Sequence, residues 1–356
     1  MPRKRSSKPI ISTSALARHL GLSRWTISRV LNGHPEVKPE TSRRVREAMD
    51  ELGFVPSPLG RALRGASTGM IGVCFQAIGL PIISRKIATL QRVLREAGFR
   101  ALQEVTDGSL ELELTVIRHF LAMRVDGLVL VGGMSSGNAS KITTLLDQHK
   151  TPVVMIDPQE RLPLPAVELD RRAGMRCLFE HLYELGHRRF ALLGIDGNVP
   201  WGRIRCDAIE AIVREHGLSS EHDVVRLSDP APLELNFAYG KSLAEQFLQL
   251  IPRPTAILAI NDQVAIGAML RLQEAGVAVA DEVSIVGFDN LDVSPHIKPA
   301  LTSVDQHIDE IMQTAVALLV RQTGGNSSAE PAFCQVNPLL IPRESSAAAP
   351  VSAALA

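Results

Sequence analysis

Features that mark several protein classes are missing from this chain of 356 residues. No apolar run approaches the roughly 18 residues of a membrane-spanning helix, and no apolar segment follows the basic N-terminus as in a secretory signal. The cysteines form no CxxC pair and have apolar neighbours, so we expect buried free thiols at Cys74, Cys177, Cys206 and Cys334. These absences predict a cytoplasmic protein without a membrane partner.

The signatures of common enzyme classes are also absent. The stretch VGGMSSGNASK comes closest to a phosphate-binding loop, but it lacks the Lys-Ser/Thr ending and the required glycine spacing. The ten histidines form no HExxH zinc motif and no Ser-His-Asp signature. The sequence therefore predicts no catalytic residue, no metal site and no cofactor.

Charge is balanced over the whole chain but unevenly distributed along it. The chain holds 38 Lys and Arg and 38 Asp and Glu, whereas residues 1–65 hold 13 and 5 of them, a net charge of +8. A small cationic segment on a larger anionic remainder suits a polyanion partner for that segment alone. The first residues, MPRKRSSK, fit an arm that contacts phosphates and equally fit a disordered tail with incidental charge.

Two apolar patterns at helical spacing flank Gly21 and predict a helix-turn-helix. They consist of Leu16, Ala17 and Leu20 before it and Ile27, Val30 and Leu31 after it. Gly21 can end the first helix in a left-handed conformation, and Ser23 can cap the second. The outer face of the second helix is rich in hydrogen-bond donors, as a helix in a DNA major groove requires, although many helical hairpins also have a polar outer face.

A third helix and a short fourth segment follow. Pro39 fits the first turn of the third helix, and Gly53 fits its end. Residues 57–66 predict a helix too short to persist alone, in which Leu63 lies between Arg61 and Arg64. An apolar side chain with basic neighbours suits insertion into a DNA minor groove.

From residue 70 onward, apolar strands alternate with amphipathic helices. Strands such as MIGVCF, VDGLVLVGG and TPVVMID are apolar throughout, which is typical of a parallel sheet covered on both faces. A second such series begins near residue 168. Ligands of doubly wound folds bind at the carboxyl ends of the strands, so two facing lobes predict a shared ligand cleft.

These motifs resemble the LacI/GalR family of transcription regulators over nearly the whole chain. The segments that carry the resemblance include LARHLGLSRWTISRVLNG, RALRG, HLYELGHRRFALLG, PTAILAINDQVAIGAMLRLQEAG and VSIVGFDN. The resemblance implies an α/β protein with an all-α helix-turn-helix head and a hinge helix, followed by a two-lobed, periplasmic-binding-protein-like body of doubly wound parallel sheets. The implied parts are a head at 1–56, a hinge at 57–66 and a body at 67–345, and the composition of the remaining residues predicts a disordered tail at 346–356. Within the body, the N-lobe is expected at about 67–166 plus 306–333, and the C-lobe at about 167–305 plus 334–345.

The resemblance also implies which residues contact DNA. Arg24 and Trp25 occupy the base-reading positions at the start of the recognition helix, and Leu63 occupies the position of the hinge leucine. Contacts to bases and phosphates are implied for Thr26, Ser28, Arg29 and Asn32. Trp25 has one alternative, in which its ring folds back over the core of the head.

The effector site is implied in the same way. Arg205 matches an arginine that reaches ligand hydroxyls or carboxylates, and Asp289 matches an acid that accepts from sugar hydroxyls. Asn261 and Gln306 add polar residues to the pocket in this interpretation, and Trp201 could stack on the face of a sugar. Asp289 and Asn261 could instead be turn or helix caps, and Trp201 could be a lip residue without a ligand.

One wall of the cleft departs from the family pattern. Ile82 and Ile83, in QAIGLPII, replace two aromatic residues and make that wall more apolar, which puts an ordinary hexose effector in doubt. The resemblance implies a repressor that binds a pseudo-palindromic, double-stranded DNA operator as a homodimer, gated by a small carbohydrate-like effector. The tail has no leucine heptads, so no tetramerising coiled coil is expected. The alternatives are control by a protein co-repressor or a non-sugar ligand, an enzyme on a Rossmann-like body, and a free solute-binding protein.

Overall fold

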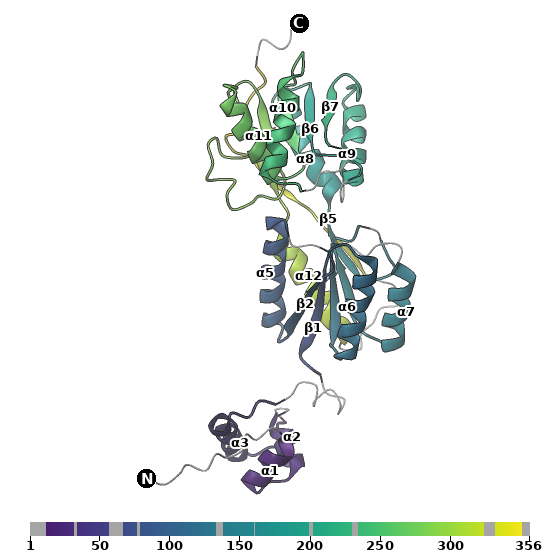
Figure 1. The fold of residues 1–356 in the computed structure, drawn as a ribbon, viewed down its shortest axis with the longest axis vertical. Coiled ribbons are helices and arrows are strands. Elements are labelled where there is room, and N and C mark those ends of the chain that lie inside the picture. Colours follow the sequence, from purple (N-terminus) through teal and green to yellow (C-terminus); the bar gives the residue numbers. More distant parts are fainter. Residues whose placement is uncertain are drawn as a thin grey trace. The chain divides into compact units, whose positions relative to one another are not determined.

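The computed structural model describes residues 12–31, 34–56, 67–76, 79–132, 138–159, 161–198, 202–229, 234–323 and 332–350. The chain divides into two compact units, Met1–Gly69 and Met70–Ala356, which we call the head and the body (Figure 1). The expected hinge at 57–66 with Leu63, the site residues Asn32 and Trp201, and residues 1–11 lie outside the described ranges. Within those ranges, no helix combines the length and apolar character needed to cross a membrane.

The described part of the head contains the three predicted helices, which are α1 (Thr13–Leu20), α2 (Arg24–Leu31) and α3 (Pro39–Leu52). Ser23 caps α2 as expected, because its Oγ accepts a hydrogen bond of 3.0 Å from the backbone N–H of Thr26. Gly21 ends α1 with φ of 64°, a conformation that glycine adopts without a steric cost. Gly21 and Ser23 therefore fix the turn between α1 and α2.

A small apolar core joins these helices. Its buried members are Leu16, Ala17, Leu20, Ile27, Val30, Val45, Ala48 and Phe54, and Leu31, Met49 and Leu52 are partly buried against them. The guanidinium of Arg44 on α3 donates a hydrogen bond of 2.8 Å to the carbonyl oxygen of Leu20 at the end of α1. The core and this bond hold α2 with one side inward and the other side free for contact.

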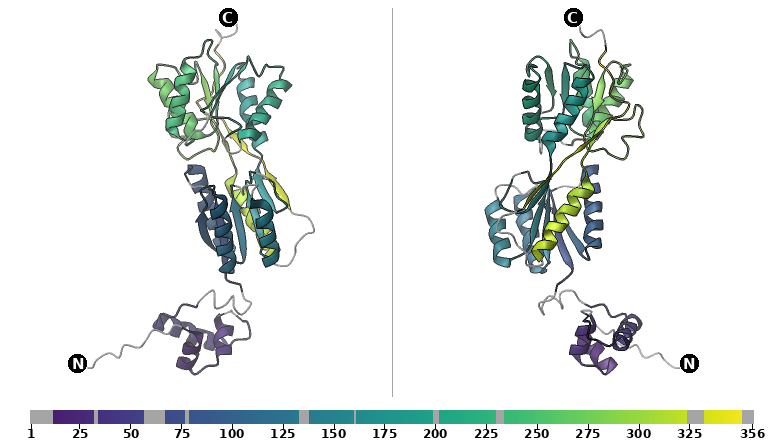
Figure 2. Two further views of the ribbon diagram at one scale, coloured as in Figure 1. Left: turned by 45° about the vertical axis from the view of Figure 1, so that its right-hand side comes forward. Right: turned by 180° about the vertical axis from the view of Figure 1, so that it is seen from behind.

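The N-lobe of the body is a parallel sheet in the order β11-β5-β4-β3-β1-β2. Its strands are β1 (Met70–Phe75), β2 (Arg100–Val105), β3 (Gly127–Val131), β4 (Val153–Ile156), β5 (Ala166–Leu169) and β11 (Phe333–Val336). Helices α5 (Pro81–Glu96) and α12 (Ile308–Thr323) cover one face, and α6 (Leu110–Ala122) and α7 (Ala139–His149) cover the other (Figure 2). Covering both faces explains why the central strands are apolar throughout.

The C-lobe repeats this arrangement with a parallel sheet in the order β7-β6-β8-β9. The strands are β6 (Phe190–Leu193), β7 (Val224–Leu227), β8 (Ala256–Ala259) and β9 (Ser284–Val286). Helices α8 (Arg171–Glu184) and α9 (Gly202–Glu215) pack together, as do α10 (Phe237–Leu248) and α11 (Asp262–Glu274). The predicted doubly wound, two-lobed body is confirmed.

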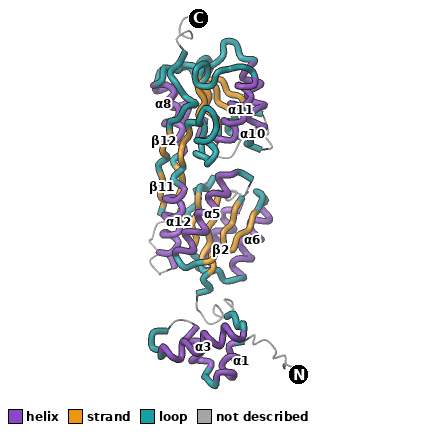
Figure 3. The backbone as a smooth tube through the Cα atoms, turned by 90° about the vertical axis from the view of Figure 1, so that its left-hand side faces the viewer, coloured by secondary structure: helices purple, strands orange, loops and turns teal. Residues whose placement is uncertain are grey.

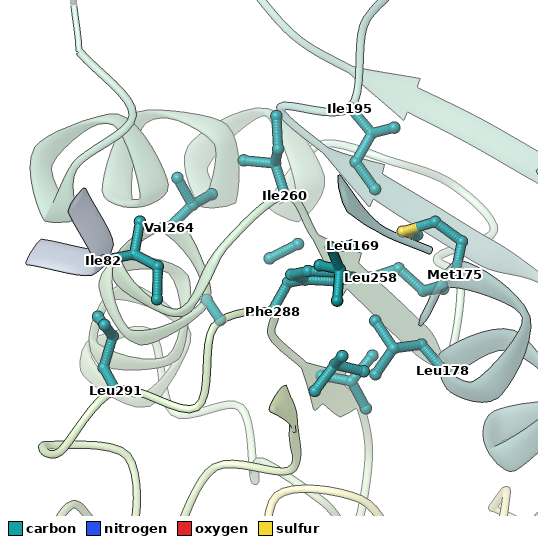
Figure 4. Packing of buried hydrophobic residues seen from close by; sticks show 14 of the residues in the cluster. Ile82, Leu169, Met175, Leu178, Ile195, Leu258, Ile260, Val264, Phe288 and Leu291 are labelled. Atoms are coloured by element: carbon teal, nitrogen blue, oxygen red, sulfur yellow. The ribbon is translucent and has the colours of Figure 1, made fainter. Parts of the chain in front are cut away.

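The chain passes between the lobes after β5, after β10 (Ser303–Asp305) and between β11 and β12 (Leu339–Ile341). Strands β10 and β12 pair antiparallel, and Figure 3 shows β12 following β11 along one side of the body. Strands β5 and β11 both belong to the N-lobe sheet, so this lobe extends to Leu169 and Val336, a few residues beyond the boundaries expected at 166 and 333. Apolar packing is continuous between the lobes. Ile82 of the N-lobe and Ile260 and Phe288 of the C-lobe belong to a single buried cluster (Figure 4).

The cysteines are free thiols, as expected from their spacing. Only Cys74, on β1, is buried, and burial raises the pKa of its thiol to about 12. Cys177, Cys206 and Cys334 are half-buried rather than buried, in contrast to the expectation from their apolar neighbours.

The segment after Arg343 differs from the expected disordered tail. Ser345 is fully buried, and its Oγ accepts from the backbone N–H of Thr302 at 2.9 Å. Ser346 Oγ lies 2.8 Å from His181 Nε2, and the N–H of Ala347 donates to Ser284 Oγ at 3.0 Å. Residues 346–349 therefore belong to the C-lobe. Composition suggested disorder because serine and alanine bury little apolar area, whereas here their backbone and hydroxyl groups are bonded to the lobe.

We predict that this segment stabilises the C-lobe. A chain that ends at Arg343 should have an unfolding free energy about 3–6 kcal/mol lower than a chain that ends at Pro350, since several hydrogen bonds of about 1 kcal/mol each are lost. Thermal denaturation of the two chains measures the difference. Equal melting temperatures would show that the segment contributes nothing.

Candidate functional site

The exposed face of α2 carries the residues expected to contact DNA. Arg24 is exposed, Thr26, Ser28 and Arg29 are partly exposed, and Trp25 is 65% exposed. The ring of Trp25 stacks with Arg29, whose guanidinium carbon lies 4.3 Å from the ring centroid. The indole is therefore directed outward, and the alternative in which it folds over the core does not describe this structure.

Arg29 is held by the segment that follows α2. Its guanidinium forms an ion pair with Glu36 and lies within 3.0 Å of the His34 ring nitrogen Nδ1. The arginine is thus oriented before any partner binds, but Glu36 also offsets its charge. Arg24 has no such acidic partner among the described residues, which leaves it the better placed of the two for a base or a phosphate.

A cavity of about 90 Å³ lies between the two lobes of the body. It brings together the expected site residues Arg205, Asp289, Asn261, Gln306, Ile82 and Ile83. Three further charged residues line it that sequence reasoning did not single out, namely Lys86, Asp157 and Arg171. Leu80, Leu235 and Ile260 add to the apolar wall that the two isoleucines form. The cavity thus combines an apolar wall with buried charges, as small-molecule sites do.

Asp289 follows β9 and carries a strained backbone. Its φ is 118°, a conformation that side chains other than glycine rarely adopt and that costs about 1–3 kcal/mol. Its Oδ1 accepts a hydrogen bond of 2.5 Å from Gln306 Nε2, and it caps no helix. Burial, reinforced by the nearby Asp262, raises the pKa of Asp289 to about 7, although Arg205 and Lys86 oppose the rise.

We predict a pH dependence from this shift. A carboxyl group whose pKa is raised in the folded protein binds more protons folded than unfolded between about pH 4 and pH 7. Its contribution to stability is complete below about pH 4 and is lost as the pH rises through about 7. The unfolding free energy of the wild type minus that of Asp289→Asn should therefore fall from pH 4 to pH 7, by up to about 1.4 kcal/mol per pH unit.

Denaturant titrations of both chains from pH 4 to 8 measure this difference. Burial lowers the pKa of His181 and His187 and raises that of Asp262, but these groups are present in both chains, so their direct contributions cancel. A difference that does not change with pH would contradict the prediction.

Asn261 has a local role that the sequence left open. Its Oδ1 accepts from the backbone N–H of Val264 at 2.9 Å and caps α11, and its Nδ2 donates to the carbonyl oxygen of Leu235 at 3.0 Å. Both ends of the amide are therefore already used at the cavity wall. Asn261 shapes the cavity, and one N–H of its Nδ2 and one lone pair of its oxygen are left for a ligand.

A buried ionic cluster forms the N-lobe side of the cavity. Asp157, which directly follows β4, forms an ion pair with Lys86 on α5 and another with Arg171 on α8, the latter at 3.1 Å. Its Oδ1 also accepts from the backbone N–H of Leu169 at 2.9 Å. Burial alone would raise the pKa of Asp157, but Arg171 and Lys86 together hold it well below its usual range.

Arg205 on α9 is the least compensated charge of the cavity. Its side chain is nine-tenths buried, its Nε has no hydrogen-bond partner, and no described carboxylate lies within 4.0 Å of its nitrogens. The guanidinium carbon lies 4.9 Å from the ring centroid of Phe288. Burial, reinforced by the positive charge of Arg171, lowers the pKa of Arg205 to about 10.

Comparisons with known proteins agree with this architecture. The family model described as "Bacterial regulatory proteins, lacI family" matches residues 15–57, and a "Periplasmic binding protein-like domain" matches residues 179–346. The repressor PurR of Photobacterium profundum is 26% identical, with 93% of this chain and 97% of the relative covered. Catabolite control protein A of Staphylococcus epidermidis is 29% identical, with 86% and 90% covered.

A solved structure shows the same likeness in three dimensions. The lac repressor dimer bound to operator and the anti-inducer ONPF superimposes with a TM-score of 0.83 at 26% identity, over 96% of this chain and all of that one. The relatives named here are transcription regulators, so the enzyme alternative is set aside. The chain thus combines a lacI-family helix-turn-helix domain with a periplasmic-binding-protein-like body, and over nearly its whole length it is similar to LacI-family transcription repressors.

Proposed function

We propose that this protein represses transcription by binding a pseudo-palindromic DNA operator as a homodimer. The observation that carries the proposal is the outer face of α2, where Arg24 and Trp25 are exposed at the start of a capped helix. Thr26, Ser28 and Arg29 continue this face. One eight-residue helix can read only a few base pairs, so a dimer that presents two such helices suits an operator with two half-sites.

Two further residues belong to this proposal although they lie outside the described ranges. Asn32 continues the same helical face in the sequence, and Leu63 is the apolar residue of the hinge segment. A leucine between two arginines suits insertion into the minor groove between the half-sites. The lac repressor structure, a dimer on its operator, supports both the stoichiometry and the DNA partner.

We further propose that a small, carbohydrate-like effector binds between the lobes and changes the affinity for DNA. Support comes from the cavity, in which Arg205, Asp289 and Gln306 meet residues of the N-lobe. A ligand that contacts both lobes favours one arrangement of the lobes over another. Because such coupling is reciprocal, DNA binding changes the affinity for the effector by the same factor.

Selection from a random duplex library tests the DNA-binding part. The full chain should enrich sequences that contain an inverted repeat. Arg24→Ala should then weaken binding of the enriched duplex by about 10- to 100-fold, as expected for loss of a base contact. Arg46→Ala, on the exposed face of α3, is the control with the same change of charge and should leave affinity nearly unchanged. Enrichment of no sequence would overturn the proposal.

A further inference from the structure

The cavity between the lobes is surrounded by an excess of buried positive charge. Lys86, Arg171 and Arg205 line it, and the side chain of each is at least nine-tenths buried. Two carboxylates line it with them, and only Asp157 is directly paired with any of the three cations. Asp157 is already shared between Lys86 and Arg171. The third cation, Arg205, therefore lines the cavity without forming an ion pair with a described carboxylate.

Two buried polar atoms at the cavity lack partners, and they are of opposite kinds. Arg205 Nε is a donor without an acceptor, and Gln306 Oε1 is an acceptor without a donor. An unsatisfied buried polar group is costly, more so when it is charged. A ligand that satisfies both atoms carries an acceptor for Arg205 and a donor, such as a hydroxyl group, for Gln306, and a negatively charged acceptor makes the stronger bond to the guanidinium.

The second carboxylate of the cavity offsets the charge of Arg205 only in part, because no ion pair within 4.0 Å joins Asp289 to Arg205. Asp289 is bonded to Gln306 and lies close to Asp262, whose own oxygens accept from Ser294, Ser303 and the N–H of Leu291. Two carboxylates so close together do not both ionise easily, and burial raises the pKa of both. The positive charge of Arg205 thus remains available for a ligand.

We propose that the effector is a small hydroxycarboxylate of the sugar-acid class, a monoanion with several hydroxyl groups. Its carboxylate pairs with the guanidinium of Arg205, whose planar fork fits a carboxylate in a bidentate contact. Its hydroxyls donate to Gln306 and Asp289, and its C–H groups lie against Ile82 and Ile83. The small size of the cavity, about 90 Å³, favours a compact ligand. This inference rests on the proposed function, because it names the chemical class of the ligand at the same site.

Matched pairs of ligands test the charge class on the full-length protein. Gluconate is compared with glucitol, glucuronate with glucose, and glucose 6-phosphate provides the phosphate arm, each at saturating concentration in a thermal-shift measurement. At least one acid should raise the melting temperature by several degrees, whereas its neutral counterpart should not. The proposal would be overturned if a neutral compound or glucose 6-phosphate raised the melting temperature more than the acids do. It would also be overturned if none of the acids raised the melting temperature.

Variants then locate the charge, with calorimetric titration of the acid that binds. Arg205→Gln should weaken the acid by about 10- to 100-fold, the range expected for a charged hydrogen bond. Lys86→Met leaves Asp157 paired with Arg171 and should weaken the acid while keeping the fold. Arg172→Gln, an exposed neighbour of the cluster, is the matched control and should bind normally. Equal weakening by Arg172→Gln would overturn the assignment to Arg205.

Binding of the selected operator without ligand separates the two proposals. If the chain binds the operator but prefers neutral sugars, the proposed function stands and the proposal of an anionic effector is refuted. A chain that binds sugar acids but selects no DNA sequence refutes the proposed function instead.

Discussion

Replacing Asp157 with asparagine is expected to lower the unfolding free energy of the body by about 3–5 kcal/mol. The carboxylate is the shared partner of Lys86 and Arg171, so its removal leaves two buried positive charges without their counter-ion. In a unit of this size the loss corresponds to a fall in melting temperature of roughly 5–8 °C. Thermal and denaturant unfolding of both chains measure it.

Two further chains make this prediction specific. Glu168→Gln removes a carboxylate that pairs with the exposed Arg161 and should cost at most about 1 kcal/mol. Adding Lys86→Met to the Asp157→Asn chain should recover part of the loss, because one of the two unpaired charges is removed. A cost no larger than that of Glu168→Gln would show that the cluster is not stabilised by Asp157.

The second large effect concerns the head. Ile27→Asp should abolish DNA binding because Ile27 is fully buried at the centre of the head core. A unit of about 45 residues has about 2–7 kcal/mol of stability in total, and burial of an unpaired carboxylate costs at least as much. The body is a separate compact unit and should keep its melting temperature.

Circular dichroism and DNA titration check both halves of this prediction. Arg46→Gln produces the same change of one unit in net charge at an exposed position on α3, so it separates unfolding from the change in charge. It should weaken DNA binding only slightly and leave the helical signal intact. Retained DNA binding by Ile27→Asp would show that the head does not carry the activity.

Much of the head could be predicted from sequence because its determinants are local. Apolar spacing placed Ile27 and Val30 in the core, Ser23 marked the start of α2, and Gly21 marked the end of α1. The alternative for Trp25 was not decidable from sequence, because a ring at that position can turn inward or outward at similar cost. The structure directs it outward, where Arg29 stacks on it.

The charged side of the cavity was not predicted because its contacts join distant parts of the chain. Lys86 and Asp157 lie 71 residues apart in sequence yet form an ion pair. A local signal existed for Lys86, which falls on the same buried face of α5 as Ile82 and Leu90. A lysine in such a position requires a buried partner. Asp157 directly follows an apolar strand and Asp289 comes three residues after the end of another, whereas Arg171 gave no local signal.

The boundaries of the lobes depend on strand pairing rather than on composition. Strand β11 pairs with β5 across more than 160 residues, and no local pattern reveals that both belong to the N-lobe sheet. The same holds for residues 346–349, whose hydrogen-bond partners lie on distant elements of the C-lobe.

Sequence-specific DNA binding by the head is the central claim, and a specificity ratio tests it most directly. The affinity of the full chain is measured for the selected duplex and for a scrambled duplex of equal length and composition, at several salt concentrations. We predict at least about 10³-fold tighter binding of the selected duplex at physiological salt, with both affinities falling steeply as salt rises. Equal affinity for the two duplexes, or affinity that does not depend on salt, would contradict it.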